Sequence, residues 1–330
     1  MNPIVSICCT AYNHVDYIKD AIEGFLMQKT DFPIEIIIHD DASTDGTTDI
    51  INEYEAKFPD LINPIYQKEN QWSKGIKPSP TYVWPKAKGK YIALCEGDDY
   101  WTDPLKLQKQ VDFLEANPDC IACHHWQKYA YEDNNGKFIE SEAPTKNQGY
   151  LPIEKSTVRE IFKNHLRIKT RTVIYRNINL EIPEWFYKVA FGDVPLSMIF
   201  GKYGKFGFIN EPMAVYRQTG LGVSSHGKHS FWFVYNHYIE WIKIWELGII
   251  HHEYKYQKEA IKTIKYFYSL ILNHYKNGFN IFIKLFIYSL FNSRIKYKVR
   301  VEMSYYINKL YFDNFKFLLK KKLKPIFTKV

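Results

Sequence analysis

Short apolar runs alternate with amphipathic segments over the first third of the chain. The first run covers residues 3–10, is rich in Ile, Val and Cys, and lies between Pro3 and the polar cluster Tyr12–His14. Two further runs cover residues 34–38 and 91–95. Apolar runs of about four to eight residues that end in polar residues are typical of buried strands, so three strands are predicted here.

Between these runs, apolar residues recur at helical spacing. The repeat after the first strand is Val15, Ile18, Ile22, Phe25 and Leu26, and the repeat after the second is Ile50, Ile51, Tyr54 and Phe58. Asp45 is the expected N-cap of the second helix. Asp103 and Pro104 are expected to start a third helix, which carries Leu107, Val111 and Leu114.

Strands that alternate with helices indicate βαβ units, and hence an α/β fold with a mostly parallel sheet covered by helices on both faces. Ligands in such folds bind outside the carboxyl ends of the strands. The second strand ends in His39-Asp40-Asp41-Ala42-Ser43 and the third in Glu96-Gly97-Asp98-Asp99. We therefore expect both acidic clusters to lie at one edge of the sheet, where a ligand would bind.

The second half of the chain is less regular. A polar loop is expected over residues 132–146, a helix around 158–162 and a strand over 171–175. Asp193 precedes an apolar helix over residues 194–200, which makes it a third candidate carboxylate.

From Phe231 onward the pattern is helical, aromatic and basic. A chain of 330 residues is long enough for one large domain with an appended segment. We therefore predict a catalytic domain at 1–228 and a helical C-terminal extension at 229–330.

Cysteine usage and the start of the chain indicate the compartment. The five cysteines lie mostly in apolar runs, and the first residues show no basic segment followed by an apolar one. These features predict a reducing environment, no secretory signal and a cytoplasmic location.

The formal charge of +8 is unevenly distributed. Residues 251–330 hold 17 Lys and Arg against 4 Asp and Glu, which gives that segment +13 and the first 250 residues −5. The basic segment is expected either to meet an anionic surface or to be a solvated tail. The acidic body argues against nucleic acid as a partner, because phosphate affinity requires a basic face around the stacked bases.

The longest apolar stretch of the tail covers residues 279–291. It contains Lys284 and is shorter than the ~20 residues that a membrane-spanning helix needs. With Arg294–Arg300 and Lys320–Lys324 behind it, it predicts an interfacial segment that holds the protein peripherally on the inner face of the membrane. Packing of this segment on the rest of the protein is the alternative.

The loop after the first strand, Thr10 to His14, contains neither G-x-G-x-x-G nor G-x-x-x-x-G-K-[ST]. A bound nucleotide diphosphate would therefore need another partner for its charge. Mg²⁺ or Mn²⁺ binds through one or two carboxylates and phosphate oxygens, and Glu96, Asp98 and Asp99 could supply the carboxylates. Helix capping with solvation is the alternative explanation of this acidic cluster.

Three ordered motifs resemble family 2 glycosyltransferases of the GT-A fold. They are ICCTAYN at residues 7–13, IIHDDASTDGT at 37–47 and GKYIALCEGDDYWTDPLKL at 89–107. The resemblance extends from the first strand to Tyr216-Arg217. It implies an inverting, metal-dependent enzyme that moves a sugar from a nucleotide-diphosphate sugar, expected to be a UDP-sugar, to a hydroxyl of a growing surface glycan or lipid-linked oligosaccharide.

The resemblance also implies roles for individual residues. Those expected to bind the nucleotide sugar are Thr10, Tyr12, Asn13, Asp40, Asp41, Ser43, Glu96, Asp98 and Arg217. Asp98 and Asp99 would hold Mn²⁺ or Mg²⁺, which stabilises the leaving nucleotide. Arg217 would close over the diphosphate. Asp193 would be the general base that takes the proton of the acceptor hydroxyl.

One segment departs from the family pattern. Sequences similar to this one usually read Y-R-x-H-x-G-G-V-W-S, whereas Thr219 stands at the histidine position and Ser224 at the tryptophan position. His226 could replace the histidine from a shifted position, or it could be a solvent-exposed loop residue. Without that histidine, metal binding would rest on carboxylates and phosphate.

Other interpretations were weighed against this one. Cys120-x-x-Cys123-His124-His125 could suggest zinc, but it lacks a second pair at finger spacing, so a buried strand explains it better. A nucleotidyltransferase is a rival function, although its Gly- and Lys-rich loop is missing after the first strand. A non-catalytic glycan-binding relative is a second rival, and the retained Asp98, Asp99 and Asp193 argue against it. The oligomeric state, the sugar and the linkage stay open.

Overall fold

The computed structural model describes residues 2–133, 136–142, 153–219, 231–274, 279–292, 294–296 and 299–312. The chain divides into two compact units. The first contains residues 1–161 and 165–222, and the second contains residues 162–164 and 223–330. The predicted boundary between residues 228 and 229 lies outside the described residues.

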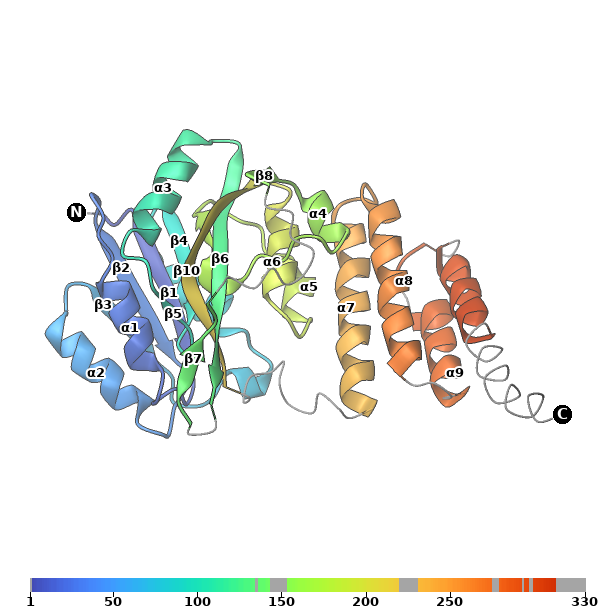
Figure 1. Ribbon diagram of the computed structural model, residues 1–330, viewed down its shortest axis with the longest axis horizontal. Coiled ribbons are helices and arrows are strands. Elements are labelled where there is room, and N and C mark those ends of the chain that lie inside the picture. The colour runs from blue at the N-terminus through green and yellow to red at the C-terminus, as the bar shows by residue number, and fades with distance from the viewer. Residues whose placement is uncertain are drawn as a thin grey trace. The chain divides into compact units, whose positions relative to one another are not determined.

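A ten-stranded mixed sheet forms the centre of the first unit (Figure 1). Its strands are β1 (Val5–Ala11), β2 (Ile34–Asp40), β3 (Ile62–Tyr66), β4 (Tyr91–Glu96), β5 (Tyr100–Trp101), β6 (Cys120–Glu132), β7 (Phe138–Glu140), β8 (Lys155–Ser156), β9 (Ile174–Arg176) and β10 (Lys205–Gln218). The order is β3-β2-β1-β4-β9-β6-β10-β5, with β7 paired to β6 and β8 paired to β10. β1 to β4 run parallel, β6 and β10 run parallel, and the antiparallel β9 joins the two groups.

The three strands predicted from apolar runs are β1, β2 and β4, and the segment around Cys120 is the buried strand β6. The strand expected over residues 171–175 is confirmed only in part. Residues Thr170–Thr172 form a short 3-10 turn, η4, and β9 begins at Ile174. The predicted polar loop over 132–146 includes the short strand β7, which pairs with the end of β6.

Helices cover both faces of the sheet (Figure 1). One face packs against α1 (Ile18–Leu26), α2 (Thr47–Lys57) and α3 (Lys106–Ala116). The other face packs against the short turns η2 (Ser79–Val83) and η3 (Trp84–Lys86) and against α6 (Asp193–Phe200), where the Phe200 ring centroid lies 4.5 Å from that of Tyr175. The remaining short elements are η1 (Trp72–Lys74), α4 (Val158–Phe162) and α5 (Glu184–Tyr187). Burial of both faces explains why β1, β2 and β4 read as continuous apolar runs.

Two predicted helix starts were wrong by one or two residues. The N-cap of α2 is Gly46 with φ of 102°, although Asp45 still accepts the N–H of Thr47 at 3.0 Å. Similarly, α3 begins at Lys106, and Asp103 accepts the Leu105 N–H at 2.8 Å. In both cases the acid still satisfies a free N–H near the helix start.

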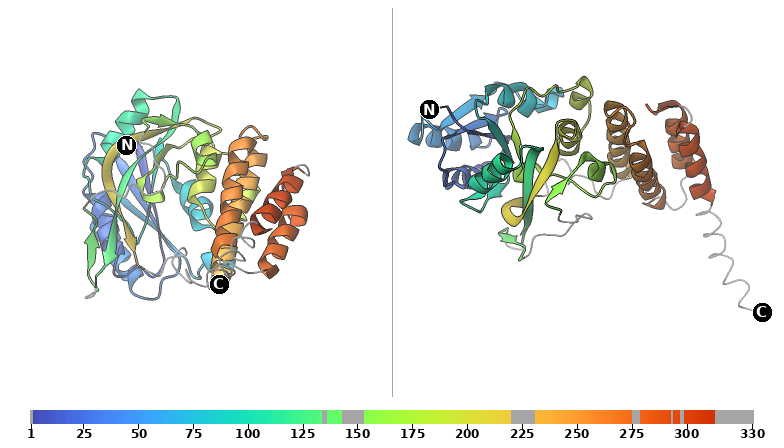
Figure 2. Two further views of the ribbon diagram at one scale, coloured as in Figure 1. Left: turned by 45° about the vertical axis from the view of Figure 1, so that its right-hand side comes forward. Right: turned by 90° about the horizontal axis from the view of Figure 1, so that it is seen from above.

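The second unit is helical. It contains α7 (Phe231–His251), α8 (Gln257–His274), α9 (Phe279–Ile287), the short π-helical turn η5 (Tyr288–Asn292) and a further helix over residues 299–312. These helices, orange to red in Figure 2, stand side by side, and aromatic rings such as Trp245 and Phe267, whose centroids lie 5.2 Å apart, fill the space between α7 and α8. Over the described ranges, we find no helix whose length and apolar character would let it cross a bilayer.

Gly89, just before β4, lies close to the backbone of β1 and provides a test of the packing of the sheet. A Cβ at this position would lie 2.6 Å from Ser6 N and 2.8 Å from both Tyr91 O and Val5 C. Gly89→Ala is therefore expected to destabilise the first unit by about 1–3 kcal/mol, because backbone atoms cannot yield as a side chain would. Thermal unfolding checks this against Gly192→Ala, where an added Cβ meets nothing within 4 Å. Equal melting temperatures for the two variants would contradict this packing.

Candidate active site

The carboxyl ends of β1, β2 and β4 lie at one edge of the sheet. Ala11 pairs with Asp40, and Thr10 pairs with both His39 and Glu96. The two acidic clusters therefore come to the same edge, as the sequence predicts.

Asp40 and Asp41 hold the loops that follow β2. The buried Asp40 accepts the N–H of Ser43 at 3.0 Å and, through its other oxygen, the hydroxyl of Thr48. The two oxygens of the buried Asp41 accept the successive N–H groups of residues 71 and 72 at 2.8 and 3.0 Å. All four carboxylate oxygens thus bind groups of the protein, so these two acids shape the edge.

Asn13 and Ser43 join the loops after β1 and β2. The Asn13 N–H donates to Ser43 Oγ at 2.9 Å, and the Thr44 N–H donates to Asn13 Oδ1 at 2.9 Å. Asn13 has φ of 54°, a left-handed conformation that Asn tolerates better than most residues. Tyr12, the residue before it, is exposed. The two loops therefore form one connected rim with Tyr12 on its surface.

Asp99 forms the most buried ion pair at this edge. Its side chain is 1% exposed, and its Oδ2 lies 2.5 Å from Arg171 Nε. Its Oδ1 accepts the backbone N–H of Arg217 at 2.9 Å. Asp99 thus connects the turn between β4 and β5 to η4 through the Arg171 side chain, and to β10 through the Arg217 N–H.

Arg171 connects several parts of the edge. Its NH1 donates to Gln127 Oε1 at 2.8 Å, its NH2 lies 4.0 Å from Glu96 Oε2, and its guanidinium stacks 4.2 Å from the Tyr216 ring. Burial alone would lower the pKa of Arg171, but Asp99 and Glu96 outweigh it and hold that pKa above its usual value. Arg171 is therefore a permanent buried cation.

Arg217 is also buried and holds the backbone of Asp98. Its NH1 donates to the Asp98 carbonyl at 3.0 Å, and its NH2 forms an ion pair with Asp20 of α1. Its guanidinium lies 4.5 Å from the Tyr100 ring centroid. The NH1 and NH2 groups of Arg217 thus bind protein groups, while its Nε is buried without a hydrogen-bond partner in the described part of the chain.

Glu96 and Asp98 are the acids with oxygens left for a ligand. Glu96 Oε2 is buried without a hydrogen-bond partner in the described part of the chain, and burial raises the pKa of Glu96 while Arg171 opposes the rise. Asp98 is half-buried, and its carbonyl, not its carboxylate, accepts the Arg217 bond. No group of three or more His, Cys, Asp or Glu in the ranges that the structure covers is arranged to hold a metal ion.

Asp193 begins α6 and pairs with a lysine. Its Oδ2 lies 3.2 Å from Lys169 Nζ, and its Oδ1 accepts the N–H of Val194 at 2.8 Å. Burial raises the pKa of Asp193, but Lys169, the Val194 N–H and Arg167 together lower it below its usual value. Asp193 is therefore ionised at neutral pH.

The segment Lys169–Arg171 is the part of the site that the sequence prediction missed. Lys169 pairs with Asp193, and Arg171, two residues later, pairs with Asp99. This one segment therefore lies between the acid at the start of α6 and the acid after β4. The available signal was two cations placed directly before the apolar run of β9, where an unpaired charge would be costly.

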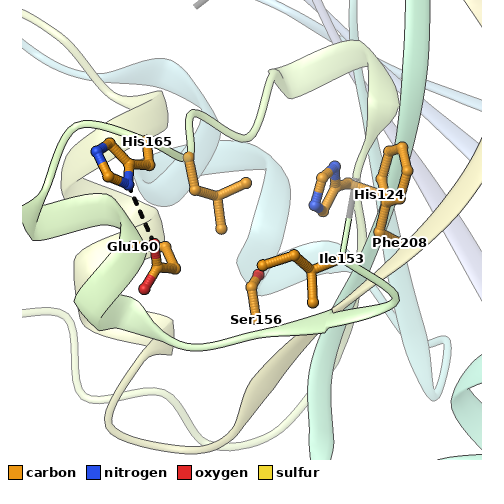
Figure 3. A pocket seen from close by; sticks show the side chains of 7 residues that line it. His124, Ile153, Ser156, Glu160, His165 and Phe208 are labelled. Carbon is orange, nitrogen blue, oxygen red and sulfur yellow. Dashed lines mark hydrogen bonds and ion pairs between the residues drawn. The ribbon is translucent and has the colours of Figure 1, made fainter. Parts of the chain in front are cut away.

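A small cavity lies elsewhere in the first unit. It is lined by His124, Ser156 and Phe208 among others, and Figure 3 shows the His124 ring turned into it. Its volume of about 20 Å³ has room for about one water molecule. Burial lowers the pKa of His124 to about 3, so its ring is neutral.

Thr219 is the last described residue after β10, and Ser224 and His226 lie outside the described residues. The predicted replacement of the missing histidine by His226 therefore stays a prediction.

Solved structures with a similar fold are known. Residues 1–349 of the S. aureus protein TarS, in complex with UDP-GlcNAc, superpose with a TM-score of 0.60 and 17% identity, over 94% of this chain and 88% of that one. This similarity, together with the mixed sheet flanked by helices, confirms the predicted GT-A-type fold.

Comparison with known sequences identifies relatives. A protein of Mycobacterium tuberculosis named uncharacterized protein Rv1520 is 35% identical over 245 residues, which are 71% of this chain and 65% of that protein, so the match spans less than two thirds of it. WfaP of Escherichia coli, named a UDP-Glc:alpha-D-GlcNAc-diphosphoundecaprenol beta-1,3-glucosyltransferase, is 33% identical over 211 residues, 58% of this chain and 79% of WfaP.

A model of one protein family, described as Glycosyl transferase family 2, matches residues 6–179, a range that runs from the second residue of β1 to beyond β9 and includes Glu96, Asp98 and Arg171. The match covers more than half of the 330 residues. The chain therefore belongs to glycosyl transferase family 2.

Proposed function

We propose that this protein transfers a sugar from a nucleotide-diphosphate sugar to an acceptor hydroxyl, with inversion at the anomeric carbon. The observation that carries the proposal is the position of Asp98. Its half-buried side chain follows β4 at the edge where β1, β2 and β4 end and makes no hydrogen bond in the described part of the chain, while Arg217 and the buried pair of Asp99 and Arg171 hold the chain around it. Family membership favours glycosyl transfer over nucleotidyl transfer at such an edge.

A uridine nucleotide is the expected donor carrier. WfaP is named for UDP-Glc, and TarS was crystallised with UDP-GlcNAc, which supports UDP in this chain. Thr10, Tyr12 and Asn13 would line the base and ribose pocket. Asp40, Asp41 and Ser43 would act by keeping that pocket in shape, since their oxygens already bind protein groups.

The residues of this edge fit a divalent cation. Glu96 has a buried oxygen without a hydrogen-bond partner in the described part of the chain, and Asp98 lies two residues from it. Two carboxylates with phosphate oxygens are a typical donor set of Mg²⁺ or Mn²⁺. We therefore propose Glu96 and Asp98 as the protein ligands, and a structural role for Asp99, whose oxygens bind arginine. When bound, the cation would neutralise the charge of the leaving diphosphate.

Asp193 is the proposed general base. The acceptor hydroxyl is a poor nucleophile, so its proton passes to Asp193 as its oxygen bonds to the anomeric carbon. The bond from that carbon to the diphosphate oxygen breaks, and the nucleotide leaves with the electron pair. Attack from the side opposite the leaving group inverts the anomeric centre.

The second unit is proposed to contact the membrane. Ile283, Ile287 and Phe291 follow one another at helical spacing and are 36%, 47% and 73% exposed. The helix over 299–312 runs antiparallel to α9, since the Phe282 ring stacks on Tyr311 and Ser289 bonds Ser304.

The second helix of this hairpin also exposes apolar side chains, those of Val301, Tyr305 and Phe312. Lys284, Arg294, Lys296 and Lys309 are exposed on the same hairpin. Apolar side chains bordered by cations fit an anionic lipid surface, where each cation adds about 1 kcal/mol. A lipid-linked acceptor of the kind in the WfaP name would lie at that surface.

Asp193→Asn tests the base. We expect turnover to fall by about 10²–10⁴, because an amide cannot take the hydroxyl proton, while UDP binding is unchanged. Release of UDP from UDP-sugars in the presence of acceptor and a UDP titration measure the two effects. Asp112→Asn, an exposed change on α3, is the matched control. Full turnover in the Asp193 variant would remove this residue from the mechanism.

Asp98→Asn tests the metal ligand. We expect Mn²⁺ to strengthen UDP binding to the native protein. In the variant, the factor by which Mn²⁺ strengthens UDP binding should be at least about tenfold smaller, because one anionic ligand is missing. Calorimetric titration of UDP with and without Mn²⁺ gives the result without any turnover. An undiminished Mn²⁺ effect in Asp98→Asn would place the cation elsewhere.

The double change Ile287→Glu with Phe291→Glu tests the membrane face. We expect the native protein to float with vesicles of phosphatidylcholine and phosphatidylglycerol, and the variant to stay in the soluble fraction, because two charges replace inserted apolar groups. High salt should weaken native binding. Ile178→Glu, at an exposed position of the first unit, is the control. Equal flotation of native protein and double variant would favour packing of this face within the protein.

A further inference from the structure

We infer that the acceptor carries an anionic group, a phosphate or a carboxylate, beside its reacting hydroxyl, and that Lys169 receives this group. The inference rests on the proposed function, in which Asp193 is the base. It starts from the contact between Lys169 Nζ and Asp193 Oδ2 at 3.2 Å.

In the free protein the base is engaged on both sides. Oδ1 accepts the N–H of Val194, and Oδ2 faces Lys169, so neither oxygen is ready for a hydroxyl proton. The side chains of Lys169 and Asp193 are 25% and 21% exposed, so a ligand can reach the pair. Something must draw Lys169 away from Oδ2 before Asp193 can act.

An anionic group of the acceptor would do this. An ammonium has three donors on a flexible stem, so Lys169 can turn from one oxygen anion to another at small cost. The turn releases Oδ2 toward the hydroxyl of the same acceptor and places an anion beside Asp193. Recognition of the charge and activation of the base then become one event.

The surroundings of Asp193 favour an anion. Arg167 acts on Asp193 together with Lys169, and both hold its pKa down against the effect of burial. The buried Lys77 donates to the carbonyl of Phe191 at 3.2 Å and lies 5.2 Å from the Phe186 ring centroid, which fixes the chain just before Asp193. Two cations, Lys169 and Arg167, thus act on the Asp193 carboxylate, and a third, Lys77, holds the backbone just before it.

The charge at position 169 can be tested with paired acceptors. N-acetylglucosamine 1-phosphate is compared with methyl N-acetylglucosaminide, and methyl glucuronide with methyl glucoside, using UDP-glucose and UDP-GlcNAc as donors with Mn²⁺. We expect the native protein and Lys169→Arg to prefer an anionic acceptor in kcat/KM by about tenfold or more, and Lys169→Met to lose that preference. Preference for phosphate or for carboxylate identifies the source of the anion.

The pH profile separates this role from a purely structural one. With neutral acceptors, Lys169→Met should move the acidic limb of kcat/KM to higher pH, because the cation that lowers the Asp193 pKa is gone. Lys57→Met, which removes an exposed ion pair with Glu53 on α2, should change neither the preference nor the profile.

Two outcomes overturn the inference: equal use of charged and neutral acceptors by the native protein, or a preference that persists in Lys169→Met. If the protein turns over none of the acceptors, saturation-transfer NMR measures binding of the four compounds to the UDP-bound protein. No binding, or equal binding of the charged and neutral compounds, would also overturn the inference. Failure of the native protein to bind UDP would instead reject the proposed function itself.

Discussion

Asp99 and Arg171 form an ion pair that is almost completely removed from water, and the active edge depends on it. The pair joins the turn after β4 to the segment before β9, and the Arg217 N–H adds β10 through the second oxygen of Asp99. Removing one partner of a buried pair leaves an uncompensated charge, at a cost of about 3–5 kcal/mol. Such a connection is rigid because neither partner can turn to solvent, and this rigidity positions the neighbouring Asp98.

The edge divides its acids between two tasks. Asp40, Asp41 and Asp99 have every carboxylate oxygen bound to a backbone or side-chain donor, whereas Glu96 Oε2, 4.0 Å from Arg171 NH2, and the Asp98 carboxylate make no hydrogen bond in the described part of the chain. Preorganised ligands need such support, because a carboxylate that must first be ordered loses part of its binding energy to that ordering. In the proposed function, a chain without a glycine-rich phosphate loop would bind a nucleotide diphosphate through two carboxylates on a backbone that Arg171 and Arg217 hold in place.

The sequence was sufficient to place the first strands and to bring both acidic clusters to one edge. Apolar runs predicted β1, β2 and β4, and their alternation with helices predicted a mostly parallel sheet, but not the strand order or the short strands. The partners of each acid could not be predicted in the same way. Arg171 lies 72 residues and Arg217 lies 118 residues along the chain from Asp99, so the local sequence pattern predicts neither contact. The structure adds that the Arg217 side chain binds Asp20 and the Asp98 carbonyl, and its role at the diphosphate stays a prediction.

The charge of the chain also limits what the site can accept. The first 250 residues are net negative, so an anionic acceptor would be repelled at long range unless cations lie close to the reacting group. Lys169 and Arg167 provide that local charge next to Asp193, while the strongly basic C-terminal segment can attract an anionic surface as a whole. In the proposed function, the basic segment would select the location and Lys169 would select the acceptor, and salt would weaken the attraction to a surface. This arrangement would suit Asp193 as a base. Lys169 keeps the carboxylate of Asp193 ionised, and it would leave that carboxylate only when an anionic group of the acceptor takes over its contact.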